Sequence, residues 1–178
     1  MKINNILLGY VNREKEGHGR QIGRYWASEL GAICNGWLKP EDFFKDKDKE
    51  LKGTRMILTG VAMEDMLHKI FQEMKVDYDY QTRQEIKIDD EIVITVKPDF
   101  VFKDFVIETK FPFSEIENTD KYAHQLEAEY QTNKKQVYLG ILSVPFDLRL
   151  IEYTPNENMW VNICEKVVLF HKKLKKLK

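Results

Sequence analysis

The stretch from Val96 to Lys110, VKPDFVFKDFVIETK, constrains this chain most, because it places charged residues inside strand-forming sequence. Its Val, Ile and Phe content predicts two β-strands, joined by a turn at Lys103-Asp104. The strands are almost continuously apolar, which is typical of strands that are buried on both faces. A charge that is buried in such a place must be paired or bound to a metal ion.

Three charged residues interrupt this apolar pattern. Asp99 lies early in the first predicted strand, and Glu108 and Lys110 lie late in the second. Side chains at i and i+2 of a strand point to the same face, roughly 6–7 Å apart, so Glu108 and Lys110 should be neighbours. A hairpin that turns at residues 103–104 would place Asp99 across from them. We therefore expect two carboxylates and one ammonium to converge at one end of a sheet.

Such a group has a chemical use. Carboxylate oxygens suit hard cations such as Mg²⁺ and Mn²⁺, which often bind one or two carboxylates together with water and phosphate. A cation there could polarise a phosphodiester and acidify water, and a neighbouring lysine could stabilise charge on the phosphate. The alternative is an exposed hairpin with an ordinary Glu–Lys pair, because charged residues are common on exposed strand faces.

Composition narrows the class of protein without identifying it. The 178 residues fit one domain, 1–178, and 43% hydrophobic with 32% charged residues indicates a folded globular chain. No apolar run is long enough to span a bilayer and the first residues lack a full signal-peptide pattern, so we expect an intracellular, cytoplasmic protein. The net charge of −1 gives no sign of nucleic-acid binding, which would need a local basic patch.

Hydrophobic spacing predicts an alternation of helices and strands. A helix over 55–75 should bury an apolar stripe, and a second helix over 114–135 should begin at Ser114 or Asn118. The expected stripes contain Met63, Met66, Leu67, Ile70, Phe71 and Met74 in the first helix, and Tyr122, Ala123, Leu126 and Tyr130 in the second. Strands are predicted over 80–88, 91–96, 136–144 and 146–153, with a last helix over 156–178. The expected fold class is α/β, with a central mixed sheet flanked by helices.

Pro98-Asp99 followed by Glu108-Thr109-Lys110 resembles the signature of the PD-(D/E)xK nuclease superfamily. The resemblance implies a restriction-endonuclease-like core over about 28–142, with the C-terminal helix packed on it. It also implies that Asp99 and Glu108 bind Mg²⁺ or Mn²⁺ with help from the Thr109 carbonyl. Lys110 would then serve the attacking water.

Two further motifs resemble the RecB-like exonuclease branch of that superfamily. Gly60 followed by Glu64 is similar to a Gly-x-x-x-Glu helix motif, which implies that Glu64 reaches the metal, with His68 as the alternative one turn later. Gln125 is similar to the glutamine of a Gln-x-x-x-Tyr motif, although Tyr130 comes one residue too late. Gln125 would orient Lys110 or a phosphate. Without the resemblance, Glu64 would be interpreted as an ordinary solvated helix residue, and Gln125 could equally be an ordinary surface residue.

Cys34, which follows Ser28-Glu29-Leu30, resembles the first cysteine of RecB-like nucleases, including CRISPR-associated exonucleases. In many of those enzymes it ligates an iron–sulfur cluster with three C-terminal cysteines. Here Cys164 is the sole cysteine near the C-terminus, so we expect no cluster and interpret Cys34 as a small buried hydrophobe. The basic end, 171–178, is interpreted either as favourable charge at a helix C-terminus or as a phosphate-binding patch.

Together, the resemblance implies a metal-dependent deoxyribonuclease, an exonuclease acting on single-stranded or end-containing DNA. DNA is the expected partner, and no membrane is expected. Two alternatives remain: an endonuclease of the same superfamily, of the restriction or junction-resolving type, and a catalytically silent nucleic-acid-binding subunit. Cleavage polarity, strand preference, a homo-oligomeric state and the biological pathway are not determined by the sequence.

Overall fold

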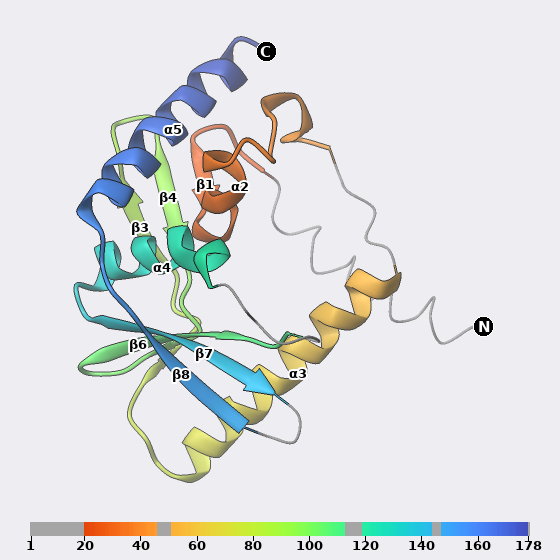
Figure 1. Cartoon of the computed structure of the whole chain (residues 1–178), viewed down its shortest axis with the longest axis vertical. Coiled ribbons are helices and arrows are strands. Elements are labelled where there is room, and N and C mark those ends of the chain that lie inside the picture. The colour runs from red at the N-terminus through yellow and green to blue at the C-terminus, as the bar shows by residue number, and fades with distance from the viewer. Residues whose placement is uncertain (1–19, 46–50, 113–118, 144–146, 178) are drawn as a thin grey trace.

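The computed structural model describes residues 20–45, 51–112, 119–143 and 147–177, except for the side chains of 51–56. Within these ranges, helices and strands are interspersed along the chain, with five consecutive strands between α3 and α4 (Figure 1). Their order is β1 (Arg24–Trp26), η1 (Ala27–Glu29), α2 (Leu30–Cys34), η2 (Pro40–Asp42), α3 (Leu51–Glu73), β2 (Asp79–Tyr80), β3 (Gln84–Lys87), β4 (Val93–Val96), β5 (Phe100–Val101), β6 (Phe105–Lys110), α4 (Asp120–Asn133), β7 (Gln136–Ser143), β8 (Asp147–Tyr153) and α5 (Glu157–Lys175). The second predicted helix appears as α4, whereas its expected start at Ser114 or Asn118 lies outside the described residues.

The strands form two mixed sheets. One has the order β1-β4-β3, with β1 parallel and β3 antiparallel to β4. The other has the order β2-β5-β6-β7-β8, in which β6 and β7 are parallel and the other neighbours are antiparallel. The mixed α/β class that the sequence predicts is therefore confirmed, although its strands are divided between two sheets.

One bent hairpin joins the two sheets. Its first arm is β2 followed by β3 and its second arm is β4 followed by β5, so that each arm contributes to both sheets. The bend falls where Gln81 has a positive φ of 50° on one arm and where Pro98, which has no N–H to donate, lies on the other. These residues break the strand that was predicted over 80–88. Asp99 lies at this bend, directly before β5.

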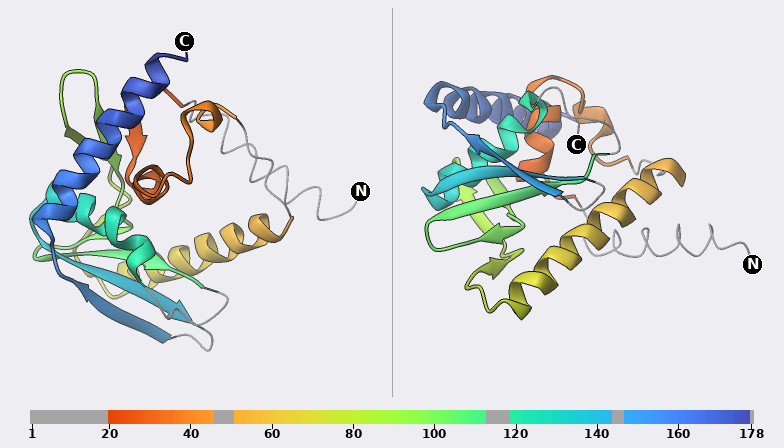
Figure 2. Two further views of the ribbon diagram at one scale, coloured as in Figure 1. Left: turned by 45° about the horizontal axis from the view of Figure 1, so that its top comes forward. Right: turned by 60° about the horizontal axis from the view of Figure 1, so that its bottom comes forward.

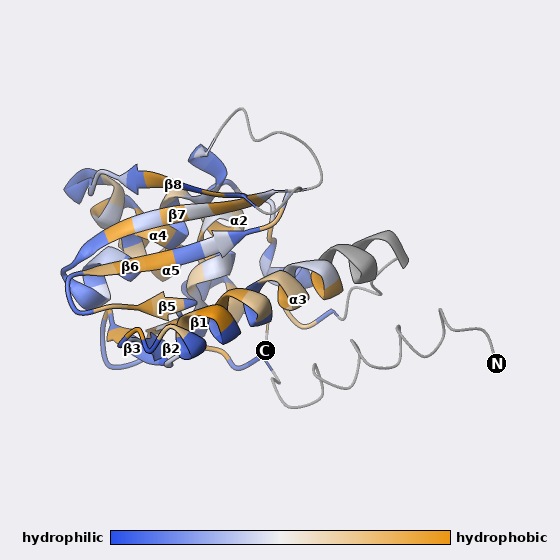
Figure 3. Cartoon of the chain, turned by 90° about the horizontal axis from the view of Figure 1, so that it is seen from below, coloured by the Kyte–Doolittle hydropathy of each residue, from blue (hydrophilic) through white to orange (hydrophobic). Residues whose placement is uncertain are grey.

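Helices α3 and α4 cover opposite faces of the five-stranded sheet (Figure 2). Neighbouring side chains of β6 alternate, so that Ile107 packs on the α3 side and Val106 on the α4 side. In α3 the residues that meet the sheet are Met63, Leu67 and Phe71. Ile70 and Met74 are exposed, so the predicted stripe was too broad. Figure 3 shows β6 changing from hydrophobic to hydrophilic at its C-terminal end.

A separate core lies between the three-stranded sheet and helices α2, α4 and α5. Tyr25, Phe43 and Phe170 meet there edge to face, at centroid distances between 5.7 and 5.8 Å. Helix α5 begins after Asn156, whose side chain accepts a hydrogen bond from the Met159 N–H, as expected of an N-cap. Within the described part of the chain, no helix combines the length and apolar content needed to cross a lipid bilayer.

Candidate active site

Asp99 and Thr109 are joined across the β5–β6 hairpin. Because Phe100 is paired with Ile107, Asp99 comes opposite Glu108, at the C-terminal end of β6. The Thr109 backbone N–H and hydroxyl both donate to Asp99 Oδ2, at 2.7 and 2.6 Å. The turn at 103–104 thus brings Asp99 to the Glu108 end of β6, as the sequence predicts. Thr109 is also paired with Gly140 in the parallel β6–β7 ladder. That its carbonyl is a metal ligand stays a prediction.

Glu108 and Lys110 lie on the α4 side of the sheet, the same side as Val106. Lys110 Nζ donates to Glu108 Oε1, and the Glu108 side chain is almost completely buried. The other carboxylate oxygen, Glu108 Oε2, is buried and has no hydrogen-bond partner among the residues that the structure describes. A buried carboxylate oxygen of this kind requires either a proton or a cation.

Helix α3 contributes Glu64 to the same site. Its carboxylate accepts a hydrogen bond from the side-chain amide of Gln81. The Tyr80 hydroxyl donates to the neighbouring Asp65 at 3.2 Å and also lies close to Glu64. Glu108 and Lys97 are close enough for their charges to act on Glu64. His68, the alternative one turn later, instead stacks on Tyr80 at 3.8 Å and shares a hydrogen bond with Tyr78. The structure therefore brings Glu64 to the carboxylates and His68 to the aromatic side chains.

Gln125 reaches the site through a residue that the sequence interpretation missed. Its amide donates to Glu129 Oε1 at 3.0 Å, one helical turn along α4. The Glu129 side chain is completely buried, lies within hydrogen-bonding reach of Glu108, and leaves its Oε2 without a donor. Tyr130, the other half of the expected motif, packs instead in the apolar cluster beneath α4. The position four residues after Gln125 is thus an acid that faces the site.

A second buried glutamate on α4 shows that burial alone does not mark a site residue. Glu127 is also completely buried, but it accepts hydrogen bonds from Gln131, Tyr153 and the backbone N–H of Asn156. These donors tie α4 to the junction of β8 and α5. Glu127 is a satisfied structural carboxylate, whereas Glu129 is surrounded mainly by other acids.

Burial and neighbouring negative charges raise the pKa of three acids of the site, Glu64, Asp99 and Glu129. Burial, followed by the negative charges of Glu108 and Glu64, raises the pKa of Asp99 well above its usual range. Burial and the neighbouring Glu108 and Asp99 do the same to Glu129. Burial would lower the pKa of the Lys110 ammonium, but the surrounding carboxylates outweigh it and the pKa is raised. Lys110 is therefore a permanent cation among acids that repel one another.

The donor set fits a hard divalent cation whose remaining ligands are water and phosphate. Among the described residues, no three His, Cys, Asp or Glu side chains are grouped so that they could hold a metal ion by themselves. Mg²⁺ commonly takes one or two carboxylates and completes its shell with water and substrate oxygens. Such a cation would pair with the unpartnered Glu108 Oε2 and would offset the burial and the negative charges that raise the pKa of Asp99.

The two cysteines lie apart from these acids, in and beside the core that contains α2 and α5. Cys34 and Cys164 are half-buried free thiols. Burial raises the pKa of Cys34 to about 11 and also raises that of Cys164, so both are neutral thiols at ordinary pH. Cys34 packs against the apolar core, which agrees with its interpretation as a small hydrophobe.

No protein-family profile matches the chain, and no curated protein sequence matches it. Solved structures share its fold. The protein SSO0001 is 13% identical, with a TM-score of 0.72 over 95% of this chain and 87% of its own. The alkaline exonuclease LHK-Exo from Laribacter hongkongensis is 13% identical, with a TM-score of 0.59 over 87% of this chain and 89% of its own.

A phage-related exonuclease from Haemophilus somnus 129PT is also 13% identical, with a TM-score of 0.53 over 99% of this chain and 98% of its own. At such low identity the likeness establishes the fold and leaves the activity open. The chain therefore has the mixed α/β fold found in these exonucleases.

Proposed function

We propose that this protein is a divalent-metal-dependent deoxyribonuclease, of the exonuclease kind, that hydrolyses phosphodiester bonds of single-stranded or end-containing DNA. The observation that carries the proposal is the meeting of Asp99, Glu108 and Lys110 at one end of β6, with Glu64 beside them. Two of the proteins that share the fold are exonucleases, and LHK-Exo has also been crystallised with dAMP, which supports a nucleic-acid substrate.

Asp99 and Glu108 would hold Mg²⁺ or Mn²⁺, with the Thr109 carbonyl and Glu64 as further ligands, directly or through water. When bound, the cation would supply the polarisation of the phosphodiester and the acidification of water. Thr109 fixes the Asp99 carboxylate through two hydrogen bonds, so this ligand is held in place before any substrate arrives.

Lys110 would orient the attacking water and stabilise negative charge that develops on the phosphate. Its raised pKa keeps it a cation, which suits the second of these roles. Gln125 would act one step further away, because its amide donates to Glu129, which adjoins Glu108. We therefore assign Gln125 a positioning role toward Glu108 rather than a direct contact with Lys110.

The test is cleavage of end-labelled single- and double-stranded DNA by the purified protein with Mn²⁺. We expect Lys110→Ala to lower the cleavage rate about 100-fold or more, in line with the loss of one electrostatic catalytic group. Lys103→Ala is the matched control, because Lys103 is an exposed lysine at the far end of the same hairpin, and it should cleave like the wild type. Cleavage that survives both EDTA and Lys110→Ala would refute the proposal.

Circular single-stranded DNA separates the exonuclease from the endonuclease alternative, because an exonuclease needs an end and cannot open a circle. We expect linear DNA to be degraded and the circle to stay intact. A nicked or linearised circle would favour the endonuclease. Mn²⁺ titration by calorimetry addresses the silent binding subunit, for which we would find neither Mn²⁺ binding nor cleavage.

A further inference from the structure

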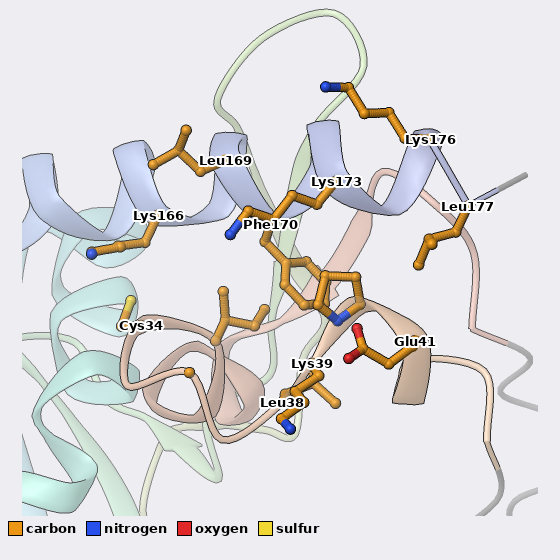
Figure 4. Close-up of a pocket in the computed structure, with 13 residues that line it drawn as sticks. Cys34, Leu38, Lys39, Glu41, Lys166, Leu169, Phe170, Lys173, Lys176 and Leu177 are labelled. Carbon is orange, nitrogen blue, oxygen red and sulfur yellow. The ribbon is translucent and has the colours of Figure 1, made fainter.

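A groove of about 600 Å³ lies between the C-terminal half of α5 and the segment that contains α2 and η2 (Figure 4). It is lined by apolar side chains that belong to the adjacent core and by charged side chains that surround them. None of the proposed catalytic residues lines it. The groove is therefore a second concave feature of the molecule, and it needs its own explanation.

The charge of the groove is strongly biased. Among the described residues, its lining includes four lysines and one acid, Glu41, in a chain whose net charge is −1. The lysines are Lys39, Lys166, Lys173 and Lys176, and all four are exposed. Within the described part of the chain, none of them makes an ion pair. Their charges are thus available to an anionic partner.

Apolar surface accompanies this charge. Leu169 and Leu177 line the groove and are 53% and 60% exposed. Trp37 is 71% exposed, and its chain neighbours Gly36 and Leu38 line the groove, so it lies at the rim although its indole does not line the groove itself. Leucines in the groove and an indole at its rim can contact flat base faces while the ammonium groups contact phosphates. A duplex conceals its base faces by stacking, and so could use only the lysines of such a surface.

We propose that this groove binds single-stranded nucleic acid, with Lys39, Lys166, Lys173 and Lys176 toward the phosphates and Trp37 toward an unpaired base. The choice of nucleic acid as the anionic occupant rests on the proposed nuclease function. The groove would hold the strand at a distance from the carboxylates, and so add affinity without taking part in bond cleavage.

The experiment measures fluorescence anisotropy of a labelled oligodeoxythymidylate in EDTA, where cleavage is suppressed. The double variant Lys166→Glu/Lys173→Glu should bind at least about tenfold more weakly than the wild type. The slope of log K against log salt concentration should become shallower by about 1.4, as expected for two lost phosphate contacts. Trp37→Ala should weaken binding about fivefold to tenfold, as expected for one lost base stack. A duplex of equal length should lose little affinity through Trp37→Ala.

The matched control is Lys87→Glu/Lys103→Glu, which reverses two exposed lysines outside the groove and removes the same charge from the whole chain. It should change affinity less than twofold. Equal loss in both double variants would show that only net charge matters and would overturn the proposal. Equal loss of duplex binding through Trp37→Ala would overturn the single-strand assignment. Displacement of the labelled oligonucleotide by polyglutamate as readily as by unlabelled oligodeoxythymidylate would also overturn it.

These results are separable from those for the nuclease. Because EDTA removes the cation, groove binding is measured whether or not the protein cleaves DNA. Mn²⁺-dependent cleavage with unchanged oligonucleotide affinity in the groove variant would refute the groove alone. Selective loss of affinity in the groove variant, together with a wild-type protein that never cleaves DNA, would refute the nuclease alone. Circular dichroism of each variant checks that the fold is retained.

Discussion

At the scale of single residues, α4 carries two completely buried glutamates in opposite circumstances. Glu127 has three hydrogen-bond donors, whereas Glu129 has Gln125 as a donor, the acids Glu108 and Asp99 close by, and Lys110 as a nearby cation that only partly offsets them. Removing a satisfied buried acceptor costs stability, whereas removing a carboxylate that must be held near other carboxylates relieves repulsion. The same substitution at the two positions should therefore have opposite signs.

We predict that Glu129→Gln raises the free energy of unfolding by about 1–3 kcal/mol near pH 8, and that Glu127→Gln lowers it by a similar amount. Because the folded pKa of Glu129 is raised, its contribution to stability is full below its unfolded pKa and is lost as pH rises toward the folded pKa. The advantage of Glu129→Gln should thus grow from acid to alkaline pH. Urea unfolding at several pH values checks this, and a destabilised Glu129→Gln at every pH would contradict it.

The sequence predicted much of the site because its chemistry is local. Asp99, Glu108 and Lys110 lie on one short hairpin, where the alternation of a strand and one turn decide which side chains meet. Glu64 could be assigned only through a motif resemblance. Glu129 was missed because its helix is rich in polar residues, and a glutamate in such a sequence is expected to be exposed to solvent. Only the packing of α4 across the sheet buries it.

At the scale of elements, α3 carries a glycine that its own packing does not require. A Cβ at Gly60 would meet nothing within 4 Å, and the residue lies inside a helix where glycine is unfavourable. We predict that Gly60→Ala raises the free energy of unfolding by about 0.5–1 kcal/mol. The matched control is Ala62→Gly, at an exposed position of the same helix, which should lower it by a similar amount. Equal destabilisation by Gly60→Ala and Ala62→Gly would contradict this prediction, because it would show that the helix requires glycine at position 60.

The bent hairpin is the element that sequence alone described least well. Alternating apolar residues predicted a continuous strand over 80–88, but Gln81 adopts a positive φ and the arm divides into β2 and β3. The sequence pattern predicted Asp99 inside a strand, whereas the chain breaks at Pro98 between β4 and β5. Neither this break nor its consequence for the partner arm was predicted. Gln81 also donates to Glu64, and its backbone N–H donates to the carbonyl of Asp99 at 3.0 Å. The bend that interrupts the strand therefore also positions the site.

At the scale of the whole molecule, the carboxylates lie where the two sheets, α3 and α4 meet. Helix α3 brings Glu64, the five-stranded sheet brings Glu108 and Lys110, the bend between the sheets brings Asp99, and α4 brings Glu129. The mixed α/β class followed from the alternation of helices and strands. The division into two sheets depends on long-range pairing such as β1 with β4, which local pattern does not specify.

The most direct test of this account is a crystal structure of the protein soaked with Mn²⁺, with the ion located by its anomalous signal. We predict one ion in contact with the carboxylates of both Asp99 and Glu108, with the Lys110 ammonium beside it. An ion bound only elsewhere, or carboxylates that face away from each other at full Mn²⁺ occupancy, would contradict the proposed metal site and the nuclease chemistry built on it.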